Sequence, residues 1–213
     1  MAARPSGLGQ VRAYLVADLL RRYAERSRLA PSVIDLSPAG EDNLRAVCAA
    51  LNIHPPRHTL TEPFAISQID GLFIDGLREP ILDIGVRLAG QTTGETLAEH
   101  WIDVPADAGE VRLGEEPLSV RMKMLGSGPD ATETLSRWRR QVAEWARSPS
   151  GAMSRRYAEA ITAAFADDLD TAAALRELAA LAEDPGEPDG VKFETFAAAD
   201  RLLGLDLARE IGR

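Results

Sequence analysis

The sequence predicts a mixed α/β fold in which the strands lie before residue 130 and the rest of the chain is helical. Two observations lead to this prediction. Before residue 130, short apolar runs with β-branched residues alternate with turns and a few helical stretches, which is typical of buried strands. After residue 130, apolar residues recur at the 3.6-residue period of amphipathic helices. We therefore expect two domains, residues 1–129 and residues 130–213.

The first part is expected to hold both kinds of element. Apolar periodicity predicts helices over Leu8–Arg26 and Glu41–Leu51, with Cys48 on the apolar face of the second. Strands are predicted over 32–36 and 69–75, and a strand or short helix over 81–88. Residues 96–102 are interpreted as a short helix or helix end, and alternation around Gly114 predicts a hairpin over 110–119. Residues 126–129 are expected to form a loop.

The second part is predicted to contain four helices. They cover residues 131–146, 150–166, 171–182 and 192–211. The first carries Leu135, Trp138, Val142 and Trp145 at helical spacing. Asp170 or Thr171 is a suitable N-cap for the third helix. The acidic segment 183–190 is expected to be a solvated loop.

Composition excludes several classes of protein. The formal net charge of −9 disfavours a large nucleic-acid surface, because phosphate binding depends on clustered cations. The sequence has neither an apolar run long enough to cross a membrane nor a signal-peptide pattern, so a cytoplasmic protein is expected. Cys48 is the one cysteine, which rules out an internal disulfide and a cysteine-based zinc cluster.

Candidate chemical groups are few and most have a structural explanation. His54 and His58 have helical spacing, but Pro55 and Pro56 between them prevent a helix that would bring both to one metal ion. The acidic run 167–170 is better explained by the preference for carboxylates at helix N-termini than by catalysis. Cys48 is expected to be a core residue rather than a reactive thiol.

Two further features are more suggestive of binding. Gly7 and Gly9 precede or open a predicted helix, and helix N-termini bind phosphate, although a single Gly-x-Gly is weak evidence and a flexible N-terminal start is the alternative. Arginines also gather over residues 137–156, including Arg139 and Arg140. They form either a basic face that contacts a partner or a charge balance for the acidic final third.

Three segments resemble class I cysteinyl-tRNA synthetases and the related mycothiol cysteine ligase, in the same order. Residues 7–22 (GLGQVRAYLVADLLRR) resemble the helix that opens with the His-Ile-Gly-His signature. Residues 97–102 and the later run EVRLGEEPLSVRMKMLGS resemble the stretch that leads into the Lys-Met-Ser-Lys-Ser loop. Residues 165–213, with the phrases DDLDTAAAL and DRLLGLDL, resemble the helical region behind the catalytic domain.

The resemblance implies a reduced Rossmann-like parallel sheet followed by an α-helical C-terminal region, and a site for ATP or an aminoacyl-adenylate-like ligand. The residues it assigns to that site are Gly7, Gly9, Gln10, Lys123 and Gly126. It also implies that Lys123 contacts the α-phosphate of the nucleotide. If the protein is an enzyme, the implied reaction is adenylate formation by a tRNA-independent ligase.

The sequence also departs from the family's pattern. Both signature histidines are replaced, and Gln10 stands at the position of the second one. The first lysine of the lysine loop is also replaced, although Arg121 lies next to its position. The cysteines of the family's zinc site are missing, so no zinc is expected, and neither an anticodon-binding domain nor tRNA charging is expected. A missing first strand would leave a sheet edge, which makes a homodimer or a partner protein plausible. A catalytically inactive paralogue that binds protein or RNA, and an unrelated small-molecule enzyme on the same fold, remain open alternatives.

Overall fold

The computed structural model describes residues 7–31, 34–35, 42–54, 58–59, 82–89, 98–106, 109 and 111–213. These residues form seven helices and two pairs of strands, so the fold is mixed α/β and mostly helical. The chain divides into two compact units, Met1–Arg112 and Leu113–Arg213. The boundary precedes the one expected near residue 130, because helix α3 (Pro117–Met124) packs on helix α4 (Ala131–Trp145) within the second unit.

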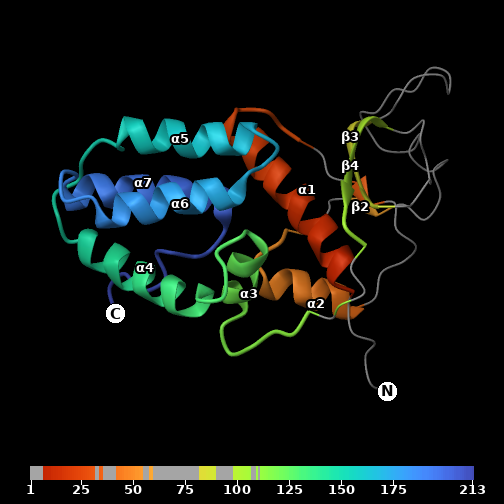
Figure 1. Ribbon diagram of the computed structural model, residues 1–213, viewed down its shortest axis with the longest axis horizontal. Coiled ribbons are helices and arrows are strands. Elements are labelled where there is room, and N and C mark those ends of the chain that lie inside the picture. The colour runs from red at the N-terminus through yellow and green to blue at the C-terminus, as the bar shows by residue number, and fades with distance from the viewer. Residues whose placement is uncertain are drawn as a thin grey trace. The chain divides into compact units, whose positions relative to one another are not determined.

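The first unit is built around the long helix α1 (Leu8–Arg26), which has the predicted bounds. Its buried face carries Val11, Leu15, Asp18 and Leu19, a helical stripe with a carboxylate inside it. Helix α2 (Asp42–Ala50) packs on α1 and buries Cys48, as predicted. Figure 1 labels these elements.

The strands of the first unit form two separate sheets. Strand β1 (Ile34–Asp35) pairs in parallel with β2 (His58–Thr59), and β3 (Leu82–Leu88) pairs in parallel with β4 (Ala98–Val104). Helix α1 packs on both β3 and β4. A larger doubly wound sheet is not found among the described residues, and the strand predicted over 69–75 lies outside them.

Two predictions of secondary structure in this region are wrong. Residues 98–104 form a strand rather than a short helix, because β3 pairs with them in parallel and Val104 is buried. The hairpin predicted over 110–119 is absent, since residues 111–116 contain no strand and α3 begins at Pro117. Proline suits a first helical position, and the Glu116 carboxylate accepts a hydrogen bond from the Leu118 N–H.

The second unit is a helical assembly. Helices α5 (Arg155–Ala166), α6 (Thr171–Glu183) and α7 (Asp189–Leu203) lie side by side, and α4 packs on α7 (Figure 1). Trp138 and Trp145 of α4 both meet the ring of Phe196 edge-on, with ring centroids 5.5 Å and 5.1 Å away. The apolar stripe predicted for α4 is therefore the centre of this core.

The bounds of two helices differ from the predictions. Helix α5 begins at Arg155 rather than Ser150, which leaves Met153 exposed ahead of it. Helix α7 ends at Leu203 instead of continuing to 211, because Gly204 adopts a left-handed conformation with φ of 66°. Asp170 caps α6 as predicted, its carboxylate accepting the N–H of Ala173 at 2.8 Å.

Candidate functional site

The N-terminus of α1 carries three of the residues assigned to a nucleotide site. Gly7 is the N-cap residue, no side chain caps this end, and the first turn contains no acidic residue. The N–H of Leu8 donates to the carbonyl of Gly109 at 2.6 Å, which occupies one of the first amides of the helix. Gly9 is buried and Gln10 is exposed. The positive end of the helix dipole is thus not neutralised by α1's own first turn.

The other two assigned residues, Lys123 and Gly126, lie at the C-terminal end of α3 in the second unit. Lys123 is exposed in the last turn of the helix. Gly126 has φ of 97°, and a Cβ there would lie 2.8 Å from the Cβ of Ala172. The adjacent Leu125 carbonyl accepts a hydrogen bond from the Thr171 hydroxyl at 2.9 Å. Packing against the start of α6 is therefore sufficient reason for a glycine at position 126.

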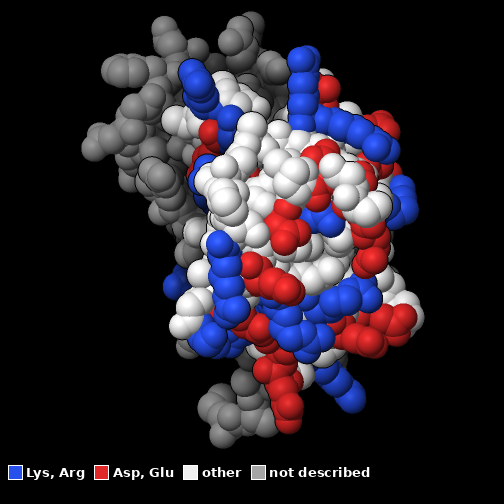
Figure 2. All heavy atoms as spheres, turned by 90° about the vertical axis from the view of Figure 1, so that its left-hand side faces the viewer, with Lys and Arg blue, Asp and Glu red and all other residues white. Residues whose placement is uncertain are grey.

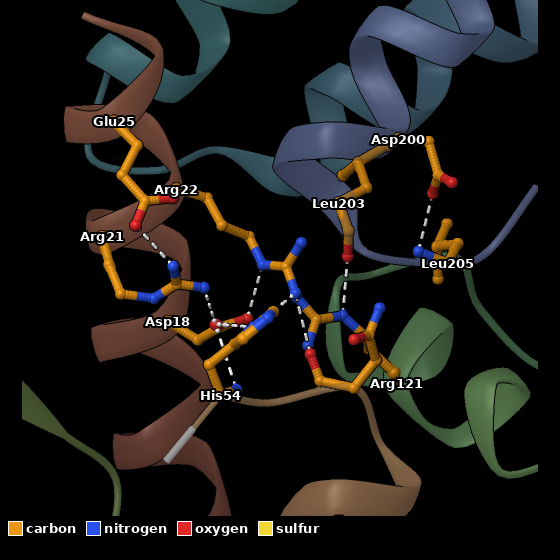
Figure 3. A network of polar contacts seen from close by, with 10 residues as sticks. Asp18, Arg21, Arg22, Glu25, His54, Arg121, Asp200, Leu203 and Leu205 are labelled. Atoms are coloured by element: carbon orange, nitrogen blue, oxygen red, sulfur yellow. Dashed lines mark hydrogen bonds and ion pairs between the residues drawn. The ribbon is translucent and has the colours of Figure 1, made fainter. Parts of the chain in front are cut away.

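The segment expected to be a lysine loop is a helix. Residues 120–124 belong to α3, and Arg121, two residues before Lys123, is fully buried. The Arg121 Nε donates to the Leu203 carbonyl at 2.6 Å (Figure 3). This contact satisfies a carbonyl at the end of α7, so Arg121 stabilises the second unit and is not available to a nucleotide.

A cluster of charged groups that sequence reasoning missed surrounds Asp18 on α1. Figure 3 shows the side chains of Arg21, Arg22 and His54 directed at its carboxylate. Arg21 donates to one oxygen at 2.8 Å and Arg22 donates to the other at 2.7 Å. The Asp18 side chain has no exposed surface. A buried carboxylate with two arginine partners meets the requirement that buried charge be paired.

The same carboxylate fixes the chain after α2. The backbone N–H of His54 donates to Asp18 Oδ1 at 3.2 Å, and the ring Nδ1 of His54 also lies 3.2 Å from that oxygen. Arg22 Nη2 donates to the Asn52 carbonyl at 2.9 Å and lies 3.1 Å from His54 Nδ1. The His54 side chain is nevertheless about half exposed, at 52%.

Electrostatics favours the charged form of Arg21 in this cluster. Burial lowers the pKa of Arg21, but the hydrogen bonds and charges of Asp18 and Glu25 outweigh it, so the pKa is raised. The available sequence signal was an aspartate within an apolar helical stripe, followed by arginines three and four residues later. The contribution of His54 had no such local signal.

A second network holds the segment that follows α7. Arg139 is 3% exposed and donates to the carbonyls of Leu205 and Asp206 and to the Glu116 carboxylate, at 2.8, 3.0 and 2.9 Å. Arg209 donates to the same Glu116 oxygen at 2.9 Å.

Asp200 completes this network from α7 itself. Its carboxylate accepts the N–H groups of Leu205 and Leu207 at 2.7 and 2.9 Å, and the first contact is drawn in Figure 3. The phrase DRLLGLDL at residues 200–207 is thus accounted for by a helix end and its cap.

The arginine-rich stretch 137–156 does not form a uniform basic face. Arg139 points into the core, whereas Arg137 and Arg140 are exposed. Arg155 pairs with Glu159 at 2.6 Å. Figure 2 shows basic and acidic side chains interspersed over the face that it presents, with no large area of one sign. This arrangement favours the interpretation as charge balance.

The loop between α6 and α7 is attached to α5 through a tyrosine. The Tyr157 hydroxyl donates to Asp184 Oδ2 at 2.9 Å, and the Gly186 N–H donates to Oδ1 at 2.8 Å. The hydrogen bond to Asp184 raises the pKa of Tyr157. The Gly186 N–H and then the Tyr157 hydroxyl lower the pKa of Asp184.

Two classes of site receive no support from the described part of the chain. No group of three or more His, Cys, Asp or Glu side chains there is arranged to hold a metal ion. Likewise, none of the helices within the described ranges is both long enough and apolar enough to cross a membrane.

Comparison with protein families, with curated proteins and with solved structures finds no match to this chain.

Proposed function

We propose that this chain is a cysteinyl-tRNA synthetase-like protein that binds ATP or an aminoacyl-adenylate-like ligand at the N-terminus of α1. The observation that carries the proposal is the start of that helix, where Gly7 leaves the end without a side-chain cap and the first turn holds no acid. Backbone amides and the positive end of the helix dipole favour a phosphate there. The sequence resemblance at residues 7–22 supports the same position.

Each assigned residue has a chemical role in this proposal. Gly7 and Gly9 let phosphate oxygens approach the backbone, and the exposed Gln10 amide donates to phosphate without adding charge. The sequence resemblance assigns a positive charge for the α-phosphate to Lys123, which is exposed in the second unit. Gly126 shapes the turn after α3. The proposal includes a reduced Rossmann-like arrangement of the first unit, of which β3 and β4 are one parallel pair.

The proposed reaction is tRNA-independent adenylate formation. A carboxylate oxygen attacks the α-phosphorus of ATP, a new phosphorus–oxygen bond forms, and pyrophosphate leaves with the electron pair of the broken bond. An acceptor amine then displaces AMP from the adenylate. Stabilising the charge that develops at phosphorus requires positioned cations.

A second candidate function is a catalytically inactive paralogue that binds a partner protein or RNA. The burial of Arg121 favours it, because this cation, two residues before Lys123, is committed to the end of α7. Electrostatic stabilisation of adenylation then depends on Lys123 alone in this stretch. Under this alternative, the exposed Arg137 and Arg140 are the surface cations to test, while Arg139 is excluded by its burial.

Calorimetric titration of the purified protein with ATP and with a non-hydrolysable cysteinyl-adenylate analogue tests the proposal. We expect saturable binding of the analogue that weakens about tenfold or more in Lys123→Ala, since a charge-assisted hydrogen bond is lost. Arg147→Ala removes another exposed cation of the second unit and should leave binding unchanged. If neither ATP nor the analogue binds, the proposal is refuted. A protein or RNA partner that binds the wild type and is lost on charge reversal at Arg137 and Arg140 would support the alternative.

A further inference from the structure

We propose that His54 is a nucleophilic site that accepts a phosphoryl group on Nε2 from a small anionic phosphoryl donor, with Asp18 as its positioning residue. The proposal is independent of nucleotide binding at the N-terminus of α1. It concerns the Asp18 cluster, in which Arg21, Arg22 and His54 contact the Asp18 carboxylate.

The geometry orients the imidazole. Asp18 Oδ1 holds both the backbone N–H of His54 and the ring Nδ1, each at 3.2 Å. A carboxylate at Nδ1 favours the tautomer in which that nitrogen carries the proton, which leaves the Nε2 lone pair available. The ring is 52% exposed, whereas the Asp18 side chain that holds it has no exposed surface.

Arg22 competes for the same ring nitrogen without displacing this arrangement. Its Nη2 lies 3.1 Å from His54 Nδ1, a contact that would need a lone pair on Nδ1. However, Nη2 already donates to the Asn52 carbonyl at 2.9 Å, so it is not left unsatisfied when Nδ1 is protonated. Asp18 offers the Nδ1 proton an ionised acceptor, which gives the stronger hydrogen bond.

The arginine beside the ring favours a phosphoryl group as the electrophile. The guanidinium of Arg22 touches the imidazole, and guanidinium groups favour phosphoryl oxygens as partners. In the proposed step, the Nε2 lone pair attacks phosphorus and a nitrogen–phosphorus bond forms. With phosphoramidate as donor, in the form whose nitrogen is protonated to –NH3⁺, the original phosphorus–nitrogen bond breaks and neutral ammonia leaves with the electron pair of that bond. The proton on Nδ1 stays directed at Asp18.

The test is phosphorylation of the intact protein by potassium phosphoramidate, followed by peptide mapping under alkaline conditions that preserve phosphohistidine. His100 is the internal control, because it is exposed on β4 and no described side chain forms a hydrogen bond to its ring. We expect His54 to react about tenfold faster than His100, and Asp18→Asn to remove most of that advantage. His54→Gln should lose the modification, while His100→Gln should leave the His54 rate unchanged.

Nitrogen-15 correlation spectra of the imidazole rings provide a measurement that needs no variant. They should show His54 with its proton on Nδ1 at a pH where the ring is neutral. Equal phosphorylation rates for His54 and His100, or a His54 ring with its proton on Nε2, would overturn the proposal. Both measurements remain decisive if Asp18→Asn does not fold.

Discussion

The two units bury charge in opposite ways. In the first unit, the buried charge is an acid, Asp18, whose carboxylate is surrounded by Arg21, Arg22 and His54. In the second unit, the buried charge is basic, and Arg121 and Arg139 donate mainly to backbone carbonyls at the end of α7 and just after it. In the first arrangement, a buried charge is paired with opposite charges. In the second, charged side chains donate hydrogen bonds to the carbonyl groups left unpaired at a helix end.

This difference determines what can be read from sequence. Asp18 and its arginines are three and four residues apart on one helix, a spacing that brings side chains together in any helix. Arg139 reaches carbonyls 66 and 67 residues later, which only the packed fold can bring within reach. The variants below test the comparison, from the largest expected effect to the smallest.

Asp18→Ala should have the largest effect. It leaves the buried guanidinium of Arg22 without its carboxylate and releases the His54 N–H, which should cost about 3–5 kcal/mol in the free energy of unfolding of the first unit. Urea denaturation measures this loss of stability, and amide hydrogen exchange shows whether it is confined to the first unit. Asp103→Ala removes the half-exposed partner of Arg87 and should cost under about 1 kcal/mol. Similar losses for both variants would show that the Asp18 cluster is not a structural centre.

Arg139→Met should destabilise the second unit. The variant keeps much of the apolar stem but leaves the carbonyls of Leu205 and Asp206 without their donor, at a cost of about 2–3 kcal/mol. Arg140→Met at the neighbouring exposed position should change stability by less than about 0.5 kcal/mol. Thermal unfolding of both variants gives the comparison, and a small effect at Arg139 would contradict the role of this network.

Gly126→Ala should cost about 1–3 kcal/mol, because φ of 97° strains an L-residue and the new Cβ would press on Ala172. Gly114→Ala is the matched control, since a Cβ there meets nothing within 4 Å. Calorimetric unfolding separates the two variants. If Gly126→Ala keeps wild-type stability yet weakens nucleotide binding, the glycine serves the ligand rather than the α3–α6 packing.

Tyr157→Phe should have the smallest effect at neutral pH and should change the pH dependence of stability. The pKa of Asp184 is lowered, so its contribution is present above the ordinary value of 3.8 and is lost as pH falls through the folded-state value. The pKa of Tyr157 is raised, so its contribution is present below 10.0 and is lost as pH rises.

In the phenylalanine variant, the free energy of unfolding should therefore no longer fall at alkaline pH through this hydroxyl. Its decrease toward acid pH should also be smaller than in the wild type. Part of that decrease should remain, because the Gly186 N–H still bonds the Asp184 carboxylate. Denaturant midpoints measured from acid to alkaline pH test this, and unchanged curves would show that the hydroxyl does not link α5 to the loop.

The helices were predictable because one local property determines them. In α1 and α4, apolar residues at helical spacing mark the buried face, and both helices form close to the predicted residues. One error occurs where the deciding partner is remote, because residues 98–104 became a strand by pairing with β3. The end of α7 is a different case, because Gly204 and the Asp200 cap are local features that the prediction did not use.

The candidate site was predictable only in part. Gly7, Gly9 and Gln10 do lie together at the start of α1, as their adjacency requires. Their assignment to a nucleotide, like that of Lys123 and Gly126, stays a prediction for the titration to decide. The role of Arg121 was missed, because an arginine between Val120 and Met122 gives no sign that its head group will reach Leu203.

By itself, the sequence determined the helices α1, α4 and α6 and the buried faces of α1 and α4, but it did not indicate α3. Those properties depend on residue spacing and on caps within a few residues. Tertiary structure alone decided that Asp18 holds His54 and that Arg121 and Arg139 hold the end of α7. The physical reason is that a buried charge or carbonyl must find a partner wherever the fold supplies one, and that partner is often tens of residues away.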